Sequence, residues 1–302
     1  IAAHLPFAMI GKSEPADAKP EGGVEIRRTV CTHCSVGCAI DAEVQNGVWI
    51  GQEPVFDSPL NLGAHCAKGA AIREHCHGEM RLKYPMKLVN GKYQKIGWDV
   101  ALNEISAKML ELRKSDGPDS VYFIGSSKHS NEQSYLMRKF VSFWGTNNCD
   151  HQARICHSTT VAGVANTWGY GAMTNSYNDM QNSKAMLFIG SNAAEAHPVS
   201  MLHTLHAKES GAKMIVCDPR FTRTAAKADQ YIRFRSGSDI AVLFGILYHI
   251  FKNGWEDKKY INDRVFGMEK VREDVLAKWT PDKAFEVSGV TDDRRRRHVR
   301  DL

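Results

Sequence analysis

Four cysteines near the amino terminus constrain this chain most. Three of them fall in one short loop, Cys31-Thr-His-Cys34-Ser-Val-Gly-Cys38, and Cys66 follows much later. Four thiolates can hold either a [4Fe–4S] cluster or a structural zinc ion. Zinc ribbons place their ligands in two separate Cys-x-x-Cys pairs, whereas a loop that carries three cysteines is typical of a cluster. The pattern therefore favours a [4Fe–4S] cluster, with zinc, or buried or disulfide-bonded cysteines, as the alternatives.

Two further residues of this region have more than one interpretation. Lys68 lies just beyond Cys66. It is either a solvated lysine or a cation that bridges a cluster and a second redox group. Cys76 has no partner pattern, and we expect it to be a small core residue.

A second reactive segment runs from Asn147 to Ser158 and contains Arg154, Cys156 and His157. Cys156 and His157 could be a nucleophile and its base. Cys156 could equally be a soft ligand to a polarisable metal, with an acid–base neighbour. It could also be an inert cysteine at a helix start. Adjacent residues on a helix point in different directions, so two residues that flank one bound group are more natural than a direct dyad.

The order of the expected elements indicates an α/β protein. Residues 24–84 read as a Cys-rich, turn-rich unit with a hairpin around Asn46-Gly47, and a second hairpin is expected at Asn90-Gly91. We expect Asp99 to cap a helix over 100–114. Beyond it, strands are expected at 120–124, 185–189, 213–217 and 230–234. Helices are expected at 131–144, 197–208, 239–252 and 255–279, with a short one from Thr222. This alternation predicts parallel sheet with right-handed crossovers.

Polar residues follow three of these strands. Asn192 and Glu195 follow the strand at 185–189. Asp218 and Arg220 follow the strand at 213–217, and Gly237 and Asp239 follow the strand at 230–234. Ligands of doubly wound sheets bind at the carboxyl ends of strands, and an acidic residue there commonly holds ribose hydroxyls. A GxGxxG fingerprint is absent from the sequence, so NAD is not indicated. The three strand ends favour a nucleotide moiety over plain loops and helix caps.

Composition excludes several classes of protein. Hydrophobic residues make up 43% and charged residues 24% of 302 residues, as in folded globular proteins. The longest apolar run, Ile240–Phe251, is too short to span a bilayer and contains His249. The net charge of +5 comes partly from an Arg run near the carboxyl terminus, so nucleic acid is not expected as a partner. Residues 1–23 read as the remnant of a signal peptide or as a disordered leader.

Taken together, the motifs resemble those of the catalytic subunits of molybdenum- or tungsten-dependent formate dehydrogenases, within the bis-molybdopterin guanine dinucleotide oxidoreductases. The matching segments run from about Glu25 to Val290. They are CTHCSVGC with HCAKG, DHQARICHSTTVAG, YGAMTN, GSNAAEAHPV, and CDPRFTRTAAKAD with RSGSDIA.

The resemblance implies roles for individual residues. Cys31, Cys34, Cys38 and Cys66 would bind the cluster, and Lys68 would carry electrons between a pterin and that cluster. Cys156 takes the position of the cysteine or selenocysteine that ligates the metal, and His157 that of the catalytic histidine beside it. The rim for one guanine dinucleotide would comprise Asn192, Glu195, Cys217, Asp218, Arg220, Gly237 and Asp239.

The resemblance also implies an architecture and a setting. We expect a leader over 1–23, a small Cys-rich [4Fe–4S] domain over 24–84, the first part of an incomplete α/β domain over 85–150, and an incomplete molybdopterin-dinucleotide-binding α/β domain over 151–302. The last two would be Rossmann-like, doubly wound and parallel, and truncated at the carboxyl terminus. Formate would be the substrate, and the 302 residues alone are not expected to turn it over.

Partners would be an iron–sulfur electron-transfer subunit and a membrane cytochrome subunit. We expect a periplasmic location, with a cytoplasmic one as the alternative. The rival functions are a nitrate or other oxyanion reductase of the same superfamily, a non-catalytic fragment, and a four-cysteine zinc protein that binds nucleic acid. The histidine after the ligand position and the AMTN segment favour formate.

Overall fold

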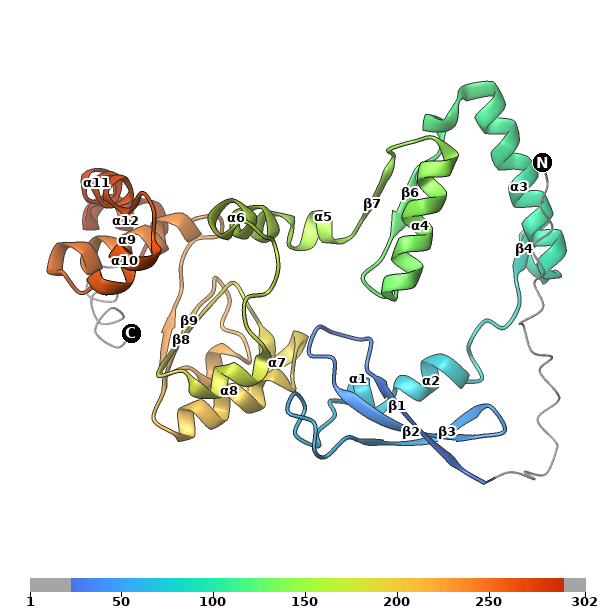
Figure 1. Ribbon diagram of the computed structural model, residues 1–302, viewed down its shortest axis with the longest axis horizontal. Coiled ribbons are helices and arrows are strands. Elements are labelled where there is room, and N and C mark those ends of the chain that lie inside the picture. Colours follow the sequence, from blue (N-terminus) through green and yellow to red (C-terminus); the bar gives the residue numbers. More distant parts are fainter. Residues whose placement is uncertain (1–22, 291–302) are drawn as a thin grey trace.

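The computed structural model describes residues 23–290, and its course is shown in Figure 1. The predicted leader, apart from Gly23, and the Arg-rich end lie outside the described residues. Along the described part of the chain, an antiparallel sheet comes first and two parallel sheets follow. None of the helices between residues 23 and 290 is long and apolar enough to cross a membrane.

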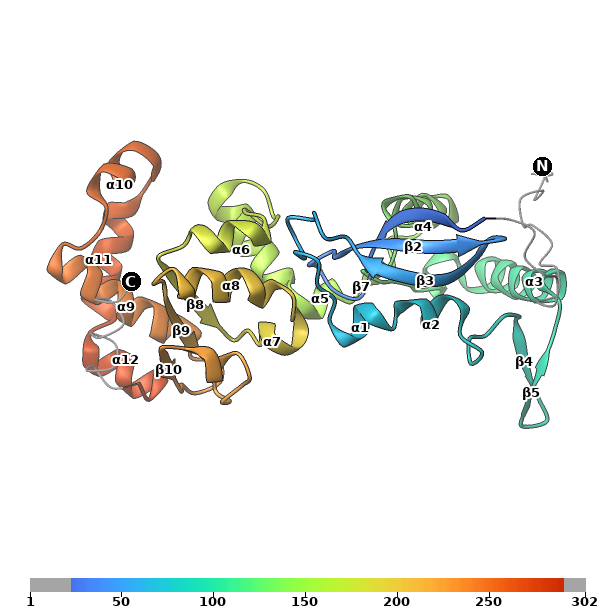
Figure 2. The same cartoon turned by 90° about the horizontal axis from the view of Figure 1, so that it is seen from below.

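The first sheet is antiparallel and has the order β1-β2-β3, with β1 at Glu25–Val30, β2 at Ala39–Gln45 and β3 at Val48–Pro54. Asn46 and Gly47 connect β2 to β3 with φ angles of 51° and 77°, the left-handed values that a tight hairpin turn requires. The predicted hairpin is thereby confirmed. Two short helices, α1 (Ala67–Ala70) and α2 (Ile72–His77), lie along one side of this sheet (Figure 2).

A second hairpin leads into a long helix. It comprises β4 (Met86–Val89) and β5 (Lys92–Lys95), as predicted, and α3 follows at Trp98–Asp116. The prediction that Asp99 caps this helix is wrong. The helix begins earlier, with Gly97 as its N-cap, and Asp99 lies in the first turn, where a carboxylate favours the positive end of the helix dipole.

A small parallel unit comes next. The strands β6 (Phe123–Gly125) and β7 (Cys149–His151) pair in parallel, and α4 (Asn131–Trp144) connects them. The predicted bounds of α4 are confirmed: Ser130 and Gln133 form a capping box at its start, and Gly145 ends it with a φ of 94°. The strand predicted over 120–124 begins later, because Pro118–Ser120 forms a 3-10 turn. β7 was not among the expected strands.

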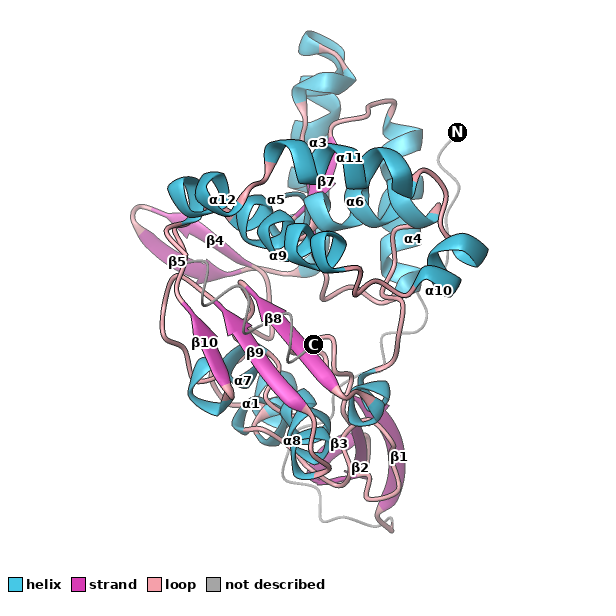
Figure 3. Ribbon diagram, turned by 90° about the vertical axis from the view of Figure 1, so that its left-hand side faces the viewer, coloured by secondary structure: helices cyan, strands magenta, loops and turns pink. Residues whose placement is uncertain are grey.

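The main parallel sheet has the order β10-β9-β8. Its strands are β8 (Ala185–Ile189), β9 (Lys213–Cys217) and β10 (Gln230–Ile232). β8 and β9 have their predicted bounds, and β10 is shorter than predicted. In Figure 3 this sheet lies between α8 (Ser200–Glu209) on one side and α9 (Asp239–Asn253) on the other.

The residues of β9 alternate between two cores. Met214 and Val216 belong to the core that includes Met201 of α8, whereas Ile215 and Cys217 belong to the core that includes Val242 of α9. A strand buried on both faces is the property of a doubly wound parallel sheet. The prediction of an α/β fold with such a sheet after a Cys-rich domain is confirmed.

The remaining helices connect and complete these units. α5 (Ala153–Cys156) and α6 (Ser158–Trp168) connect the small parallel unit to the main one (Figure 1). The other connections are η2 (Tyr177–Asn182), α7 (Ala193–Ala196) and η3 (Ala225–Lys227), the last standing where a short helix from Thr222 was expected. The charged segment after α9 forms α10 (Lys258–Arg264), α11 (Met268–Lys278) and α12 (Pro281–Ser288), and α11 and α12 pack on α9.

Candidate functional site

The four predicted cluster cysteines lie together at one end of the first sheet. Cys31 and Cys38 are buried, and Cys34 and Cys66 pack half-buried against the same apolar core. The Cys31 N–H donates to the Cys38 carbonyl over 2.8 Å and closes the loop that carries three of the cysteines. Burial raises the pKa of the Cys31 and Cys38 thiols, that of Cys38 to about 11, and the nearby thiols add to this shift. Converging thiols in a closed, apolar loop fit a cluster, whose irons favour the thiolate form.

The residues of this loop bear on the choice between a cluster and a single metal ion. Within residues 23–290, no three Cys, His, Asp or Glu side chains converge closely enough to share one ion. Ligands of one zinc ion surround a single atom, whereas the ligands of a [4Fe–4S] cluster each bind a different iron and stand further apart.

Asn61 fixes the segment that carries the fourth cysteine. Its side chain is fully buried. Asn61 Oδ1 accepts from the Ala39 N–H over 3.0 Å, and Nδ2 donates to the Ala39 and Ala64 carbonyls, each over 3.2 Å. One amide therefore ties the strand that follows Cys38 to the segment that precedes Cys66. Sequence reasoning missed Asn61, because a single asparagine in a turn-rich segment carries no distinctive signal.

Lys68 reaches from the cluster domain to the rim of the main parallel sheet. Lys68 Nζ donates to the carbonyl oxygens of Glu195 and Ala196 over 3.4 and 3.3 Å. The neighbouring His197 is half-buried, and burial together with the charge of Lys68 lowers its pKa. The structure therefore places the predicted electron-transfer lysine between the cysteine loop and the residues predicted to hold a dinucleotide. Cys76, by contrast, is exposed, so the expectation that it lies in the core is wrong.

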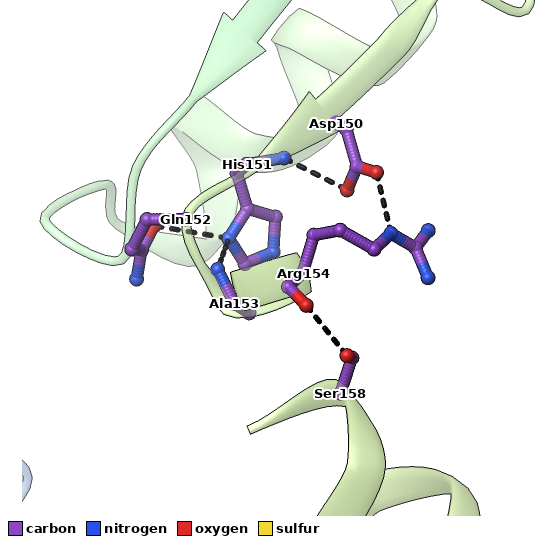
Figure 4. A network of polar contacts seen from close by, with 6 residues as sticks. All are labelled: Asp150, His151, Gln152, Ala153, Arg154 and Ser158. Atoms are coloured by element: carbon purple, nitrogen blue, oxygen red, sulfur yellow. Dashed lines mark hydrogen bonds and ion pairs between the residues drawn. The ribbon is translucent and has the colours of Figure 1, made fainter. Parts of the chain in front are cut away.

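The segment that carries Cys156 is held by a local network, shown in Figure 4. Arg154 Nε donates to Asp150 Oδ2 over 2.6 Å, and Ser158 Oγ donates to the Arg154 carbonyl over 2.6 Å. The hydrogen bond from Arg154 lowers the pKa of Asp150. Cys156 ends α5 and is exposed, and His157 connects α5 to α6.

Cys156 and His157 lie at the junction of two helices. Cys156 is the last residue of α5, and His157 is both the C-cap of α5 and the N-cap of α6. This arrangement agrees with two residues that flank one bound group.

His157 lines a cavity of about 560 Å³. The walls come from α6, from the segment Gly171–Thr174, and from Ser35 of the cysteine loop. Ser35 Oγ in turn lies 2.6 Å from the hydroxyl of Tyr177, at the start of η2. The cavity thus brings His157 and the AMTN segment together with the cysteine loop, which is far from both in the sequence. Tyr177 is a further residue that sequence reasoning missed.

The predicted dinucleotide rim lies at the carboxyl ends of β8, β9 and β10, which share one edge because the strands are parallel. Asn192 Oδ1 accepts from Thr224 Oγ1 over 2.9 Å, and Thr224 also accepts from the Ala194 N–H. Glu195 pairs with Arg223 over 3.4 Å. Thr224 and Arg223 were not predicted.

The other predicted rim residues differ in how they are placed. Asp218 Oδ1 accepts from the Arg220 N–H over 2.8 Å, Gly237 has a φ of 79°, and Asp239 begins α9. Cys217 is fully buried in the core beneath α9, and burial raises its pKa to about 12. Its thiol therefore faces the core, and only its backbone lies at the rim.

A second cavity, of about 550 Å³, lies at the corresponding end of the small parallel pair. Ser126 and Ser127, which follow β6, line it together with Asp150 and His151 of β7 and with Asn147, which precedes β7. Two parallel sheets thus each present a polar strand end, and the segment of Cys156 connects them (Figure 1).

Comparison with known proteins agrees with this arrangement. Residues 81–278 match the molybdopterin oxidoreductase family, and residues 24–78 match the molybdopterin oxidoreductase Fe4S4 domain. These matches support a [4Fe–4S] cluster and a molybdenum or tungsten molybdopterin cofactor.

Similar proteins include formate dehydrogenase subunits. The chain is 39% identical to F420-dependent formate dehydrogenase 1 subunit alpha of Methanococcus maripaludis over 87% of its own length and 38% of that protein's length. It is 40% identical to formate dehydrogenase-O major subunit of Escherichia coli over 82% of this chain and 26% of that protein.

Among solved structures, acetylene hydratase from Pelobacter acetylenicus is similar, with a TM-score of 0.76 and 26% identity. The similarity covers 90% of this chain and 38% of the hydratase chain. The chain thus spans well under half the length of these relatives. By the extent of the family match and the cysteine loop that precedes it, the chain belongs to the molybdopterin oxidoreductase family and carries that family's Fe4S4 domain.

Proposed function

We propose that the protein with this chain oxidises formate to CO2 and passes the two electrons, one at a time, through the [4Fe–4S] cluster. The observation that carries the proposal is spatial. The cavity beside His157 reaches the cysteine loop at Ser35, and Lys68, which follows Cys66, contacts the predicted dinucleotide rim. The residues predicted for the substrate site, the rim and the cluster are thus near one another, which supports electron transfer between them. Formate dehydrogenases of three organisms among the relatives support formate as the substrate.

We assign separate roles in this reaction to Cys156, His157 and Lys68. A molybdenum or tungsten bis-molybdopterin guanine dinucleotide, when bound, would supply the two-electron acceptor. Cys156 would be the soft ligand of the metal, for which its exposed thiol at the end of α5 is suited. His157, at the wall of the cavity, would orient the carboxylate and hold the proton released from formate. Lys68 would connect the rim to the cluster.

The setting of the enzyme follows from the same proposal. Electrons that leave the cluster need a further carrier, so we propose an iron–sulfur subunit and a membrane cytochrome subunit as partners. We also propose a periplasmic location, because the apolar amino-terminal residues read as the remnant of a signal peptide. Fractionation of cells that produce the protein tests this location.

Two variants of the full-length protein test the assignment of the site. Cys156→Ser is expected to abolish formate-dependent dye reduction and to lower the bound molybdenum or tungsten, while the iron content stays unchanged. Cys76→Ser is a matched control, since Cys76 is also exposed but lies in the cluster domain. Full activity in Cys156→Ser would contradict the role of the thiol as a ligand.

His157→Ala tests the acid–base role separately. It is expected to lower turnover by about 10²–10⁴-fold with the metal retained. His206→Ala, an exposed histidine on α8, is the control. Wild-type turnover in His157→Ala would refute the catalytic role of His157. If the wild-type protein reduces nitrate and does not oxidise formate, an oxyanion reductase is favoured.

A further inference from the structure

We propose that Lys128 is a charged clamp on the cysteine loop that raises the reduction potential of the [4Fe–4S] cluster. The proposal rests on the cluster assignment of the family and not on the identity of the substrate. It concerns a residue outside the cluster domain that none of the motifs singled out.

Lys128 reaches the cysteine loop from the small parallel unit. It lies in the connection between β6 and α4. Lys128 Nζ donates to the carbonyl oxygens of Thr32 and His33 over 2.8 and 2.6 Å. Both carbonyls lie between Cys31 and Cys34, two of the predicted ligands. The ammonium group is thus held against the backbone of the loop that would wrap the cluster.

The connection that carries Lys128 is itself held in place. The Lys128 N–H donates to Ser126 Oγ over 3.2 Å, and the Ser127 N–H donates to Gln152 Oε1 over 3.0 Å. Gln152, drawn in Figure 4, directly precedes α5, which ends at Cys156. A short series of contacts therefore joins the segment of the metal-ligand position to the cysteine loop, with Lys128 as its last member.

The charge of Lys128 is not neutralised by a carboxylate. Among the ion pairs of residues 23–290, none includes Lys128, whose partners are two neutral carbonyls. Reduction of a thiolate-bound cluster adds one negative charge. A fixed cation beside the loop therefore stabilises the reduced form more than the oxidised form, which raises the potential. Net charge, hydrogen bonds and exposure are the factors by which proteins set cluster potentials.

Salt distinguishes this effect from a packing effect. Lys128 is exposed to solvent, so ions screen its field, and the Debye length falls from about 30 Å at 0.01 M to about 10 Å at 0.1 M. A potential shift caused by charge must shrink as the ionic strength rises. A shift caused by distortion of the loop has no reason to do so.

The test is a redox titration of the cluster in the full-length protein, followed by EPR at low and at high ionic strength. Lys128→Met is expected to lower the midpoint potential, and to lower it more at low salt. Lys128→Arg is expected to keep the wild-type potential. Lys139→Met removes the same charge from an exposed position on α4, where Nζ lies over the Tyr135 ring, and is expected to leave the potential unchanged.

Two results would overturn the proposal. One is a wild-type potential in Lys128→Met at both ionic strengths, and the other is an equal shift in Lys128→Met and Lys128→Arg. If Lys128→Met loses iron, Lys128→Gln takes its place, because its amide still donates to the carbonyls but carries no charge. A wild-type potential in Lys128→Gln would then refute the electrostatic role.

Discussion

Replacement of Asn61 by alanine is expected to loosen the hold of the chain on its cluster. The Asn61 side chain makes three hydrogen bonds to the backbone, with Ala39 N–H, the Ala39 carbonyl and the Ala64 carbonyl. A buried hydrogen bond contributes a net amount of about 1 kcal/mol, so the loss of three costs about 3 kcal/mol. Because Ala39 follows Cys38 and Ala64 precedes Cys66, this cost falls on opening of the cluster loop rather than on the main sheet.

The magnitude can be measured as a rate. A cost of about 3 kcal/mol corresponds to roughly a hundredfold greater population of the open loop, since 1.4 kcal/mol is a factor of ten. Iron release to a ferrous chelator under native conditions, followed by absorbance, should accelerate by about this factor if release follows opening. Asn103→Ala, an exposed asparagine on α3, is the control and should release iron at the wild-type rate. The reasoning fails if Asn61→Ala releases iron no faster than the control.

Two further outcomes follow from individual side chains. Arg154→Met should raise the pKa of Asp150 towards its ordinary value, because the hydrogen bond from Arg154 is the main cause of its depression. The stabilisation from this pair is present above the ordinary aspartate pKa and is lost as the pH falls through the depressed value, and carboxyl NMR titration measures the shift. Cys217, whose burial raises its pKa to about 12, should resist iodoacetamide until the chain is unfolded, whereas exposed Cys76 should react in the native protein. Early alkylation of Cys217, found by peptide mass spectrometry, would show that the core beneath α9 opens.

The elements whose ends are marked by capping residues or turns in the sequence were predicted correctly. The bounds of α4 agree with prediction because Ser130 and Gly145 mark its two ends. The strands β8 and β9 agree because both are apolar runs between polar turns. β7 was missed because Cys-Asp-His has no strand pattern, and only its pairing with β6 makes it a strand. Asp99 misled because a good capping residue is equally favourable in the first turn of a helix that begins earlier.

The candidate site also has features that could be predicted from local sequence and features that could not. The cysteine loop could be predicted because its spacing is a local property of the sequence. The contacts of Lys128 with Thr32 and His33, and of Tyr177 with Ser35, join residues that are far apart in the sequence. A single sequence does not reveal such contacts, because the residues that flank each partner form no recognisable motif. The roles of Cys156, His157 and the rim residues stay predictions, which the geometry accommodates.

The apolar core around the cysteines draws on two regions of the chain. Besides Val36, Ile40 and Ile72, it contains Val199, and Leu202 packs against it. During synthesis, the four cysteines therefore leave the ribosome long before Val199 and Leu202, which pack on the same core. Until α8 emerges, a cluster inserted into the loop would face solvent and oxygen. Maturation should therefore favour insertion after α8 has folded, or a chaperone that covers the nascent loop in the interval.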